Sequence, residues 1–183
     1  MDKKKLIIAG VVVLGVAVVA VLIGRRKAAA ATVSSPSQAS PSGGTRTDNR
    51  PTRNNNPLNI RKSGDKFVGE TGDDGAFKIF DTPANGIRAV FRILQTYESK
   101  YDAVTLREKL VKWAPPTENR STYPDEVAKM AGVNADEPAH YYNLSYWLKV
   151  MPHWARLEGF SNLSQEDIRK GFNTANLILP KLK

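Results

Sequence analysis

The chain has 183 residues, with 27 Lys and Arg against 18 Asp and Glu, a formal net charge of +9 and no cysteine. This length suits one folded domain with additional segments. The lack of cysteine excludes disulfides and cysteine-ligated zinc sites. The positive charge favours anionic surroundings, such as phospholipid, cell-wall polymer or nucleic acid, without choosing among them.

An uninterrupted apolar run at residues 6–23 lies between Lys3-Lys4-Lys5 and Arg25-Arg26-Lys27. As a helix it would be roughly 27 Å long, close to the ~30 Å hydrocarbon core of a bilayer. A cleavable signal peptide is the alternative, but basic residues between the apolar run and the cleavage site are rare in such signals. We therefore expect residues 1–27 to be an uncleaved, single-pass membrane anchor. Basic clusters on both sides leave its orientation undecided.

A change of composition follows the anchor. Residues 28–52 are rich in Ala, Ser, Thr and Pro and carry almost no large apolar side chain. Such a segment cannot bury enough surface to offset the ordering of its backbone, so it is predicted to be a disordered linker. Residues 53–183 then form the folded domain.

That domain begins with a loop, Arg53-Asn54-Asn55-Asn56-Pro57-Leu58-Asn59-Ile60-Arg61. Asn competes for nearby backbone groups, and the residue before Pro is restricted to extended geometry. The amides either hold the loop in Asx turns or bind a polar ligand such as a sugar. Aromatic and β-branched runs at 66–71 and 76–80 flank Gly72-Asp73-Asp74-Gly75, which predicts a short β-hairpin.

The rest of the domain is predicted to be helical. Thr82-Pro83 and apolar residues at helical spacing predict a helix over 83–100, and Thr105 with Glu108 forms a capping box for the next helix. Pro115-Pro116 ends that helix, and another runs from Pro124 to Gly132. An apolar stripe from 141 to 151 predicts a helix that Pro152 interrupts, and Ser164 caps a last helix.

Several of these strings resemble a phage virion-protein domain with lysozyme-like, peptidoglycan-directed relatives. They are the Asn loop at 53–61, Asp74-Gly75-Ala76-Phe77, Phe80-Asp81-Thr82-Pro83, Gly86-Ile87-Arg88-Ala89 and Trp113-Ala114-Pro115-Pro116-Thr117-Glu118-Asn119 with Tyr123. Their order is also similar to the glucosaminidase and lytic transglycosylase branch of the lysozyme superfamily. The resemblance covers about residues 53–133. It implies a small, lysozyme-like α+β domain, mostly helical with a short β-hairpin.

The resemblance also implies glycosidic cleavage by a carboxylic acid that apolar surroundings keep protonated. In lysozyme-like relatives that Glu precedes the sheet, but this chain has no Glu before Glu70. We therefore assign the catalytic role to Glu118, with Glu70 as a second carboxylate. The expected substrate-binding residues are Asn55, Asn56, Asn59, Trp113, Asn119 and Tyr123. In the alternative, Glu118 is an ordinary loop residue and the domain is catalytically inactive.

Metal and cofactor chemistry are not expected. His140 and His153 are the only histidines, and neither has an acidic partner at ligand spacing in the sequence, whereas zinc needs three or four converging ligands. The sequence also contains no recognised phosphate-binding loop or DNA-binding motif.

The sequence as a whole predicts a membrane-anchored phage virion protein that opens host peptidoglycan during entry, as a lytic transglycosylase or muramidase-like enzyme. Its expected partners are glycan strands, the lipid bilayer of the virion membrane and other virion proteins of the capsid or vertex. Nucleic acid is not expected among them. The alternatives are a structural protein that links an internal membrane to the capsid or vertex, and a glycan-binding module.

Overall fold

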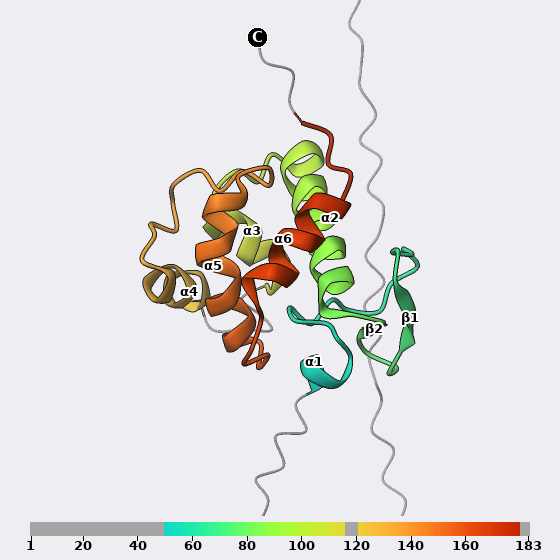
Figure 1. Cartoon of the computed structure of the whole chain (residues 1–183). Coiled ribbons are helices and arrows are strands. Elements are labelled where there is room, and N and C mark those ends of the chain that lie inside the picture. Colours follow the sequence, from blue (N-terminus) through green and yellow to red (C-terminus); the bar gives the residue numbers. More distant parts are fainter. Residues whose placement is uncertain (1–49, 116–120, 180–183) are drawn as a thin grey trace, which may run out of the picture. The chain divides into compact units, whose positions relative to one another are not determined.

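A computed structural model describes residues 50–115 and 121–179 of the chain (Figure 1). The predicted membrane helix at 6–23, nearly all of the predicted linker, Glu118 and Asn119 lie outside these residues. Within the described ranges, no helix is long and apolar enough to cross a bilayer. The described part contains six helices and one two-stranded antiparallel sheet. The mixed α+β class is therefore confirmed.

The helices begin and end close to where their capping residues predict. In chain order the elements are α1 (Arg50–Arg53), β1 (Glu70–Asp73), β2 (Lys78–Phe80), α2 (Pro83–Tyr101), α3 (Leu106–Trp113), α4 (Tyr123–Ala131), α5 (Leu144–Leu157) and α6 (Gln165–Thr174). The side chains of Thr82, Thr105 and Ser164 each accept a backbone N–H at a helix start, and Glu108 completes the capping box of α3. Gly132 caps α4 in the left-handed conformation.

Two predicted boundaries were wrong. Strand β1 begins at Glu70 rather than near residue 66, because Glu70 closes a turn on Phe67: the Glu70 N–H donates to the Phe67 carbonyl, and the Glu70 carboxylate accepts the Phe67 N–H. Helix α5 runs through Pro152 instead of stopping there. A proline inside a helix costs about 3 kcal/mol, and the fully buried Trp147, Met151 and Trp154 on either side offset that cost.

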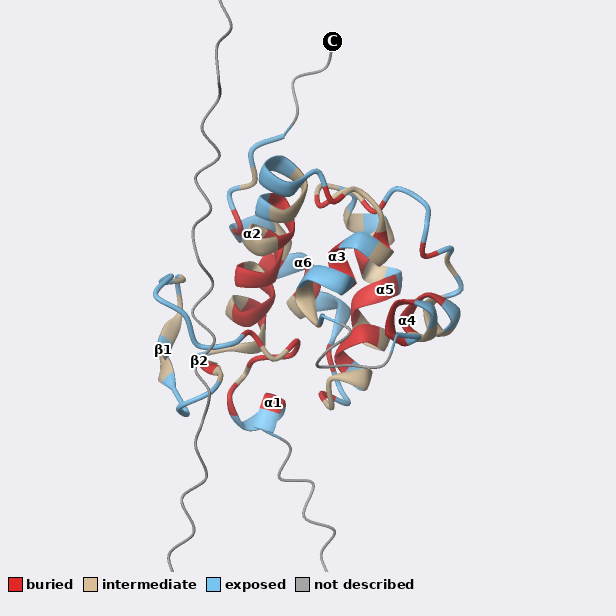
Figure 2. Ribbon diagram, turned by 180° about the vertical axis from the view of Figure 1, so that it is seen from behind, coloured by how far each residue is buried: buried red, intermediate tan, exposed pale blue. Residues whose placement is uncertain are grey.

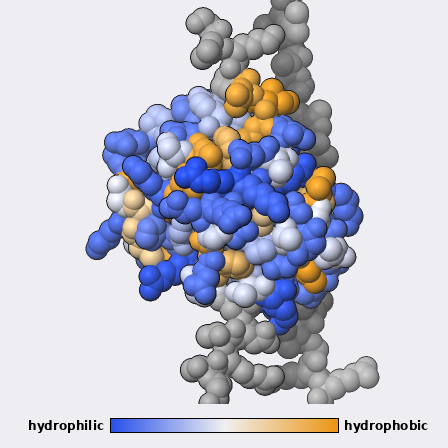
Figure 3. Space-filling view, in the orientation of Figure 1, coloured by the Kyte–Doolittle hydropathy of each residue, from blue (hydrophilic) through white to orange (hydrophobic). Residues whose placement is uncertain are grey.

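The hydrophobic core lies between the helices. The inward faces of α2 and α5 are buried along much of their length (Figure 2), and α6 packs against both helices. The face shown in Figure 3 is mostly hydrophilic, with small apolar patches. Among the residues that the structure describes, the large apolar side chains that remain exposed are Val68, Tyr101, Val111, Ile178 and Leu179.

Helix α2 makes two backbone approaches that leave no room for a side chain. A Cβ atom on Gly86 would lie 2.5 Å from the Asn55 carbonyl oxygen, so the first turn of α2 contacts the Asn loop directly. A Cβ atom on Gly171 of α6 would lie 2.7 Å from Ile87. These contacts fix the Asn loop and α6 on two sides of the same helix.

The Asn loop is held by its own side-chain amides. Asn56 is fully buried, and its Nδ2 donates to the carbonyl oxygens of Ile60 and Lys78, both at 2.9 Å, while its Oδ1 accepts the Ile60 N–H at 2.8 Å. Asn54 donates to Asp74 at 2.8 Å. The loop is therefore bonded to the β-hairpin by side chains as well as by backbone.

We expect Asn56→Ala to lower the free energy of unfolding by about 2–4 kcal/mol, because each buried backbone group left unpaired costs about 1–3 kcal/mol. Urea denaturation of the detergent-solubilised chain measures the loss. Asn173→Ala, on an exposed position of α6, is the matched control and should stay near wild type. Equal stability of the two variants would contradict the structural role of Asn56.

The Asp74 carboxylate makes stability depend on pH. Hydrogen bonds from Asn54, then from the Phe77 and Ala76 N–H groups, lower the pKa of Asp74 from 3.8 to about 2. Because the folded-state pKa is lowered, the stabilisation is complete above about pH 3.8 and is lost as the pH falls through about 2. The difference in urea midpoint between wild type and Asp74→Asn should therefore be largest above that range and shrink towards pH 2. A constant difference would contradict this assignment.

Candidate functional site: a cationic groove

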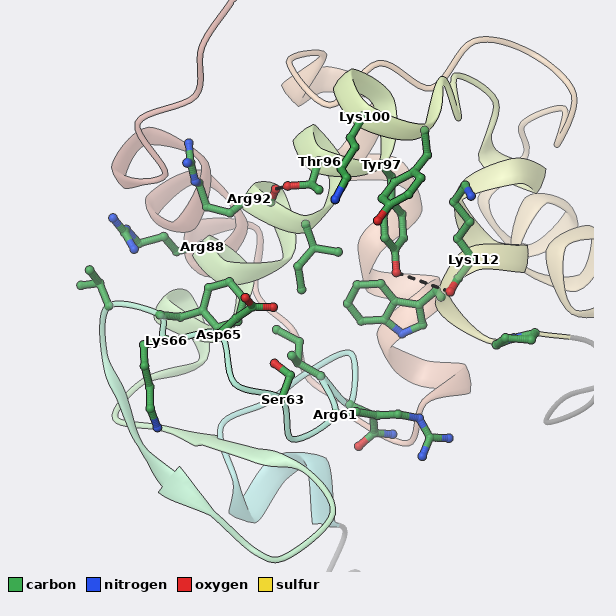
Figure 4. A pocket seen from close by; sticks show the side chains of 18 residues that line it. Arg61, Ser63, Asp65, Lys66, Arg88, Arg92, Thr96, Tyr97, Lys100 and Lys112 are labelled. Carbon is green, nitrogen blue, oxygen red and sulfur yellow. Dashed lines mark hydrogen bonds between the residues drawn. The ribbon is translucent and has the colours of Figure 1, made fainter. Parts of the chain in front are cut away.

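An open groove of about 920 Å³ lies between α2, the end of α3 and the loop that leads into β1 (Figure 4). We call it the cationic groove. Its described lining residues are Asn59, Ile60, Arg61, Ser63, Asp65, Lys66, Phe67, Val68, Arg88, Arg92, Ile93, Thr96, Tyr97, Lys100, Tyr101, Lys112, Trp113 and Pro115. Six of these are cationic and one is acidic. A groove of this size and charge suits a segment of an anionic ligand.

Aromatic rings form part of the groove lining. The Trp113 Nε1 donates to the Leu58 carbonyl oxygen at 3.0 Å, and the indole packs edge-to-face on Trp154 with ring centroids 5.0 Å apart. Tyr97 packs on Trp113 with ring centroids 6.5 Å apart. Burial, and then the neighbouring Tyr101, raises the pKa of Tyr97. The rings are thus held in place before any ligand arrives, which lowers the entropy cost of binding.

Cationic side chains surround these rings. Figure 4 shows Arg88 and Arg92 on one side of the groove and Arg61 and Lys112 on the other, with Lys100 reaching in from α2. Sequence reasoning missed this set. The sequence did contain a signal for it. Arg92 follows Arg88 by four residues and Lys100 follows Arg92 by eight, so all three lie on one face of the predicted helix.

Glu70, the predicted second carboxylate, is bound inside the fold instead. Its side chain is 5% exposed and lies 3.1 Å from the Lys78 Nζ, which is 1% exposed. Burial alone would raise the pKa of Glu70, but hydrogen bonds from Lys78, the Phe67 N–H and Lys66 lower it overall. Glu70 does not line the groove. A lowered pKa keeps the carboxyl group ionised, which is opposite to what a proton donor needs.

The Asn residues predicted to bind substrate are mostly occupied within the fold. Asn56 is fully buried, and the Nδ2 of Asn55 donates to the carbonyl oxygens of Phe80 and Asp81, both at 3.1 Å. Of the three, Asn59 lines the groove. The geometry thus supports the first of the two interpretations of the loop, in which the amides hold the backbone.

Tyr123 is buried against Glu158, a residue that sequence reasoning missed. The Tyr123 hydroxyl donates to the Glu158 Oε1 and accepts the Trp154 Nε1 proton at 2.9 Å, while Asn59 Nδ2 donates to the Glu158 Oε2 at 2.9 Å. Burial, then the Glu158 charge, raises the pKa of Tyr123. Tyr123 is 5% exposed, so it positions the end of α5 instead of facing the groove.

Of the remaining predicted residues, Trp113 lines the groove, whereas Glu118 and Asn119 lie outside the described ranges. His140 has an acidic partner after all: its Nδ1 lies 2.7 Å from the Glu98 Oε1, 42 residues earlier in the chain. In residues 50–115 and 121–179, no three His, Asp or Glu side chains are grouped so as to hold a metal ion.

These features define a small α+β domain with a cationic groove lined by aromatic rings. Protein P5 of Pseudoalteromonas phage PM2 is 35% identical to the chain over 127 residues, which cover 66% of this chain and 78% of Protein P5. The chain therefore belongs to the family of the phage protein P5. No family model matches the chain.

We expect Glu70→Gln to destabilise the domain by roughly 3 kcal/mol, because it leaves the Lys78 ammonium buried without its counter-charge. The Asp65 carbonyl oxygen, 2.6 Å from the Lys78 Nζ, keeps the loss near the lower end of the usual range. Urea denaturation measures it. Asp65→Asn makes the same change of charge at an exposed lining position and should cost less than about 0.5 kcal/mol; a similar cost for both would contradict the buried pair.

Proposed function

We propose that the chain is a protein of the phage particle, anchored in its membrane by residues 6–23, whose domain binds a glycan strand of host peptidoglycan in the cationic groove. Membership of a phage protein family supports the setting. The observation that carries the proposal is the groove itself: an open channel with fixed aromatic rings and a surplus of cations. Aromatic rings pack against the apolar faces of sugars, and cations attract the acidic groups of the wall polymer.

The predicted membrane anchor explains what wall binding would achieve. A domain held by a linker of about 25 residues stays within roughly 25–30 Å of the membrane. Binding of the wall would therefore hold the particle membrane close to the site where the wall has to be opened. The high local concentration at that site lets weak single contacts suffice.

Cleavage of the bound strand is the finer part of the proposal, and it assigns proton transfer to Glu118. In the lytic transglycosylase chemistry implied by the resemblance, one carboxyl group first donates its proton to the leaving glycosidic oxygen. It then accepts the proton of the sugar hydroxyl whose oxygen closes the anhydro ring. The described groove residues offer no substitute, because Asp65 is exposed and lacks the apolar surroundings that keep a catalytic acid protonated.

The binding test is cosedimentation of the detergent-solubilised full chain with purified sacculi. We expect Arg92→Glu with Lys100→Glu to weaken binding about tenfold, since each lost or reversed charge contact is worth about 0.2–1 kcal/mol. Lys129→Glu with Lys149→Glu, two exposed positions away from the groove, makes the same change of net charge and should bind like wild type. Equal loss in both variants would mean that net charge, and not the groove, attracts the wall.

Chromatography of released muropeptides tests cleavage in the same samples. Glu118→Gln should abolish anhydro products while sacculus binding persists. If the wild-type chain binds sacculi without cleaving them, the cleavage hypothesis is wrong and the domain is a glycan-binding module. A chain that does not bind sacculi would favour the structural alternative, in which the domain links the particle membrane to the capsid or vertex.

A further inference from the structure

One face of α2 carries a regular row of groups along the groove. Four residues that line the groove follow one another at a spacing of four: Arg88, Arg92, Thr96 and Lys100. Four residues advance a helix by about 6 Å, so the row is about 18 Å long. A row of this kind suits a linear ligand that carries acidic groups at intervals, in preference to a single small anion.

The two arginines of the row are held by neutral acceptors. The Arg88 Nε donates to the Thr174 carbonyl oxygen at 2.8 Å, and the Arg92 Nη1 donates to Gln95 Oε1 at 2.8 Å and to the Asn176 carbonyl oxygen at 3.1 Å. Neither has a carboxylate partner among the described residues. These bonds fix the guanidinium groups and leave their charges uncompensated, with further N–H donors for a ligand.

Two lysines lie against one tyrosine ring at the other end of the row. Lys100 from α2 and Lys112 from α3 place their Nζ atoms 5.2 Å and 4.6 Å from the centroid of the Tyr101 ring. The ring attracts both ammonium groups, and neither lysine pairs with a carboxylate among the described residues. The half-exposed Tyr101 thus holds two ammonium groups whose N–H groups can donate to an acidic ligand.

The arrangement of charge distinguishes between kinds of polymer. In a single-stranded nucleic acid the charge lies on the backbone and the rings are the side groups, so cations track one line and aromatic residues lie beside it. Here Tyr97 lies between Arg92 on one side and Lys112 on the other (Figure 4), and its ring packs against that of Trp113. That order suits a polymer whose backbone consists of rings and whose acidic groups are carried on its branches.

Resting on the proposed function, we propose that the α2 row and Lys112 bind the carboxylate groups of the peptide branches of peptidoglycan, while the sugar rings lie over the aromatic residues. The groove then recognises the peptide-bearing wall polymer and not the bare glycan chain. Guanidinium groups bind carboxylates through paired hydrogen bonds, which adds orientation to the attraction of charge.

The experiment compares three ligands with the detergent-solubilised full chain: sacculi, sacculi whose carboxyl groups have been converted to amides with carbodiimide and an amine, and glycan strands stripped of peptide. We expect amidation and peptide removal each to weaken binding at least tenfold. Arg92→Gln with Lys100→Gln should bind untreated sacculi about tenfold less tightly and lose less than wild type on amidation, because two of the four cationic contacts are already absent. Lys129→Gln with Lys149→Gln should behave as wild type on all three ligands.

The outcomes separate this inference from the proposed function. Undiminished binding to amidated sacculi or to stripped strands would overturn carboxylate recognition while leaving peptidoglycan binding intact. Failure to bind any of the three ligands would overturn the proposed function itself. Complete displacement by single-stranded DNA at a lower concentration than that of soluble peptide-bearing wall fragments would assign the groove to nucleic acid and overturn both.

Discussion

Every wall of the groove depends on how the Asn loop is tied to its surroundings. Asn56 bonds to Ile60 within the loop and to Lys78 of β2, and the loop carbonyl at Leu58 accepts the indole N–H of Trp113 from α3. The first turn of α2 contacts the same loop at Gly86. One short segment thus sets the distances between the hairpin, α2 and α3. Amides can do this because each offers both a donor and an acceptor to buried backbone groups that would otherwise be unpaired.

This use of the amides separates two roles that the motif alone cannot separate. An Asn that holds buried backbone groups has little capacity left for a ligand: both Nδ2 donors of Asn56 and one of its two Oδ1 lone pairs are in use. The surfaces available to a ligand are the side chains that the loop positions, among them Trp113 and the cations of α2. The central amides of the motif therefore support the site, while its last three residues, Asn59, Ile60 and Arg61, line the groove.

The sequence allowed the helices to be predicted because their signals are local: the Thr105–Glu108 capping box needs only four consecutive residues. Contacts between distant residues have no such signal. Glu158 bonds to Asn59 from 99 residues away, and the partner that keeps Glu70 ionised, Lys78, is recognisable only once β1 and β2 are paired. Continuity through Pro152 likewise depends on tertiary packing. The groove also depends on contacts between distant residues, since its sides come from three separate segments.

The positively charged side chains differ in their partners according to how far they are buried. In the described part of the chain, the buried lysines are paired with carboxylates: Lys78 with Glu70 at 3.1 Å and Lys109 with Glu98 at 3.0 Å, as the cost of burying an unpaired charge requires. Arg88 and Arg92 stay at the surface with neutral partners, where water and salt screen their mutual repulsion. A ligand that excludes this water lowers the local dielectric constant and so strengthens its own attraction to these charges. Folding thus keeps the uncompensated cations where an acidic ligand can reach them, which turns a bulk excess of charge into a local site.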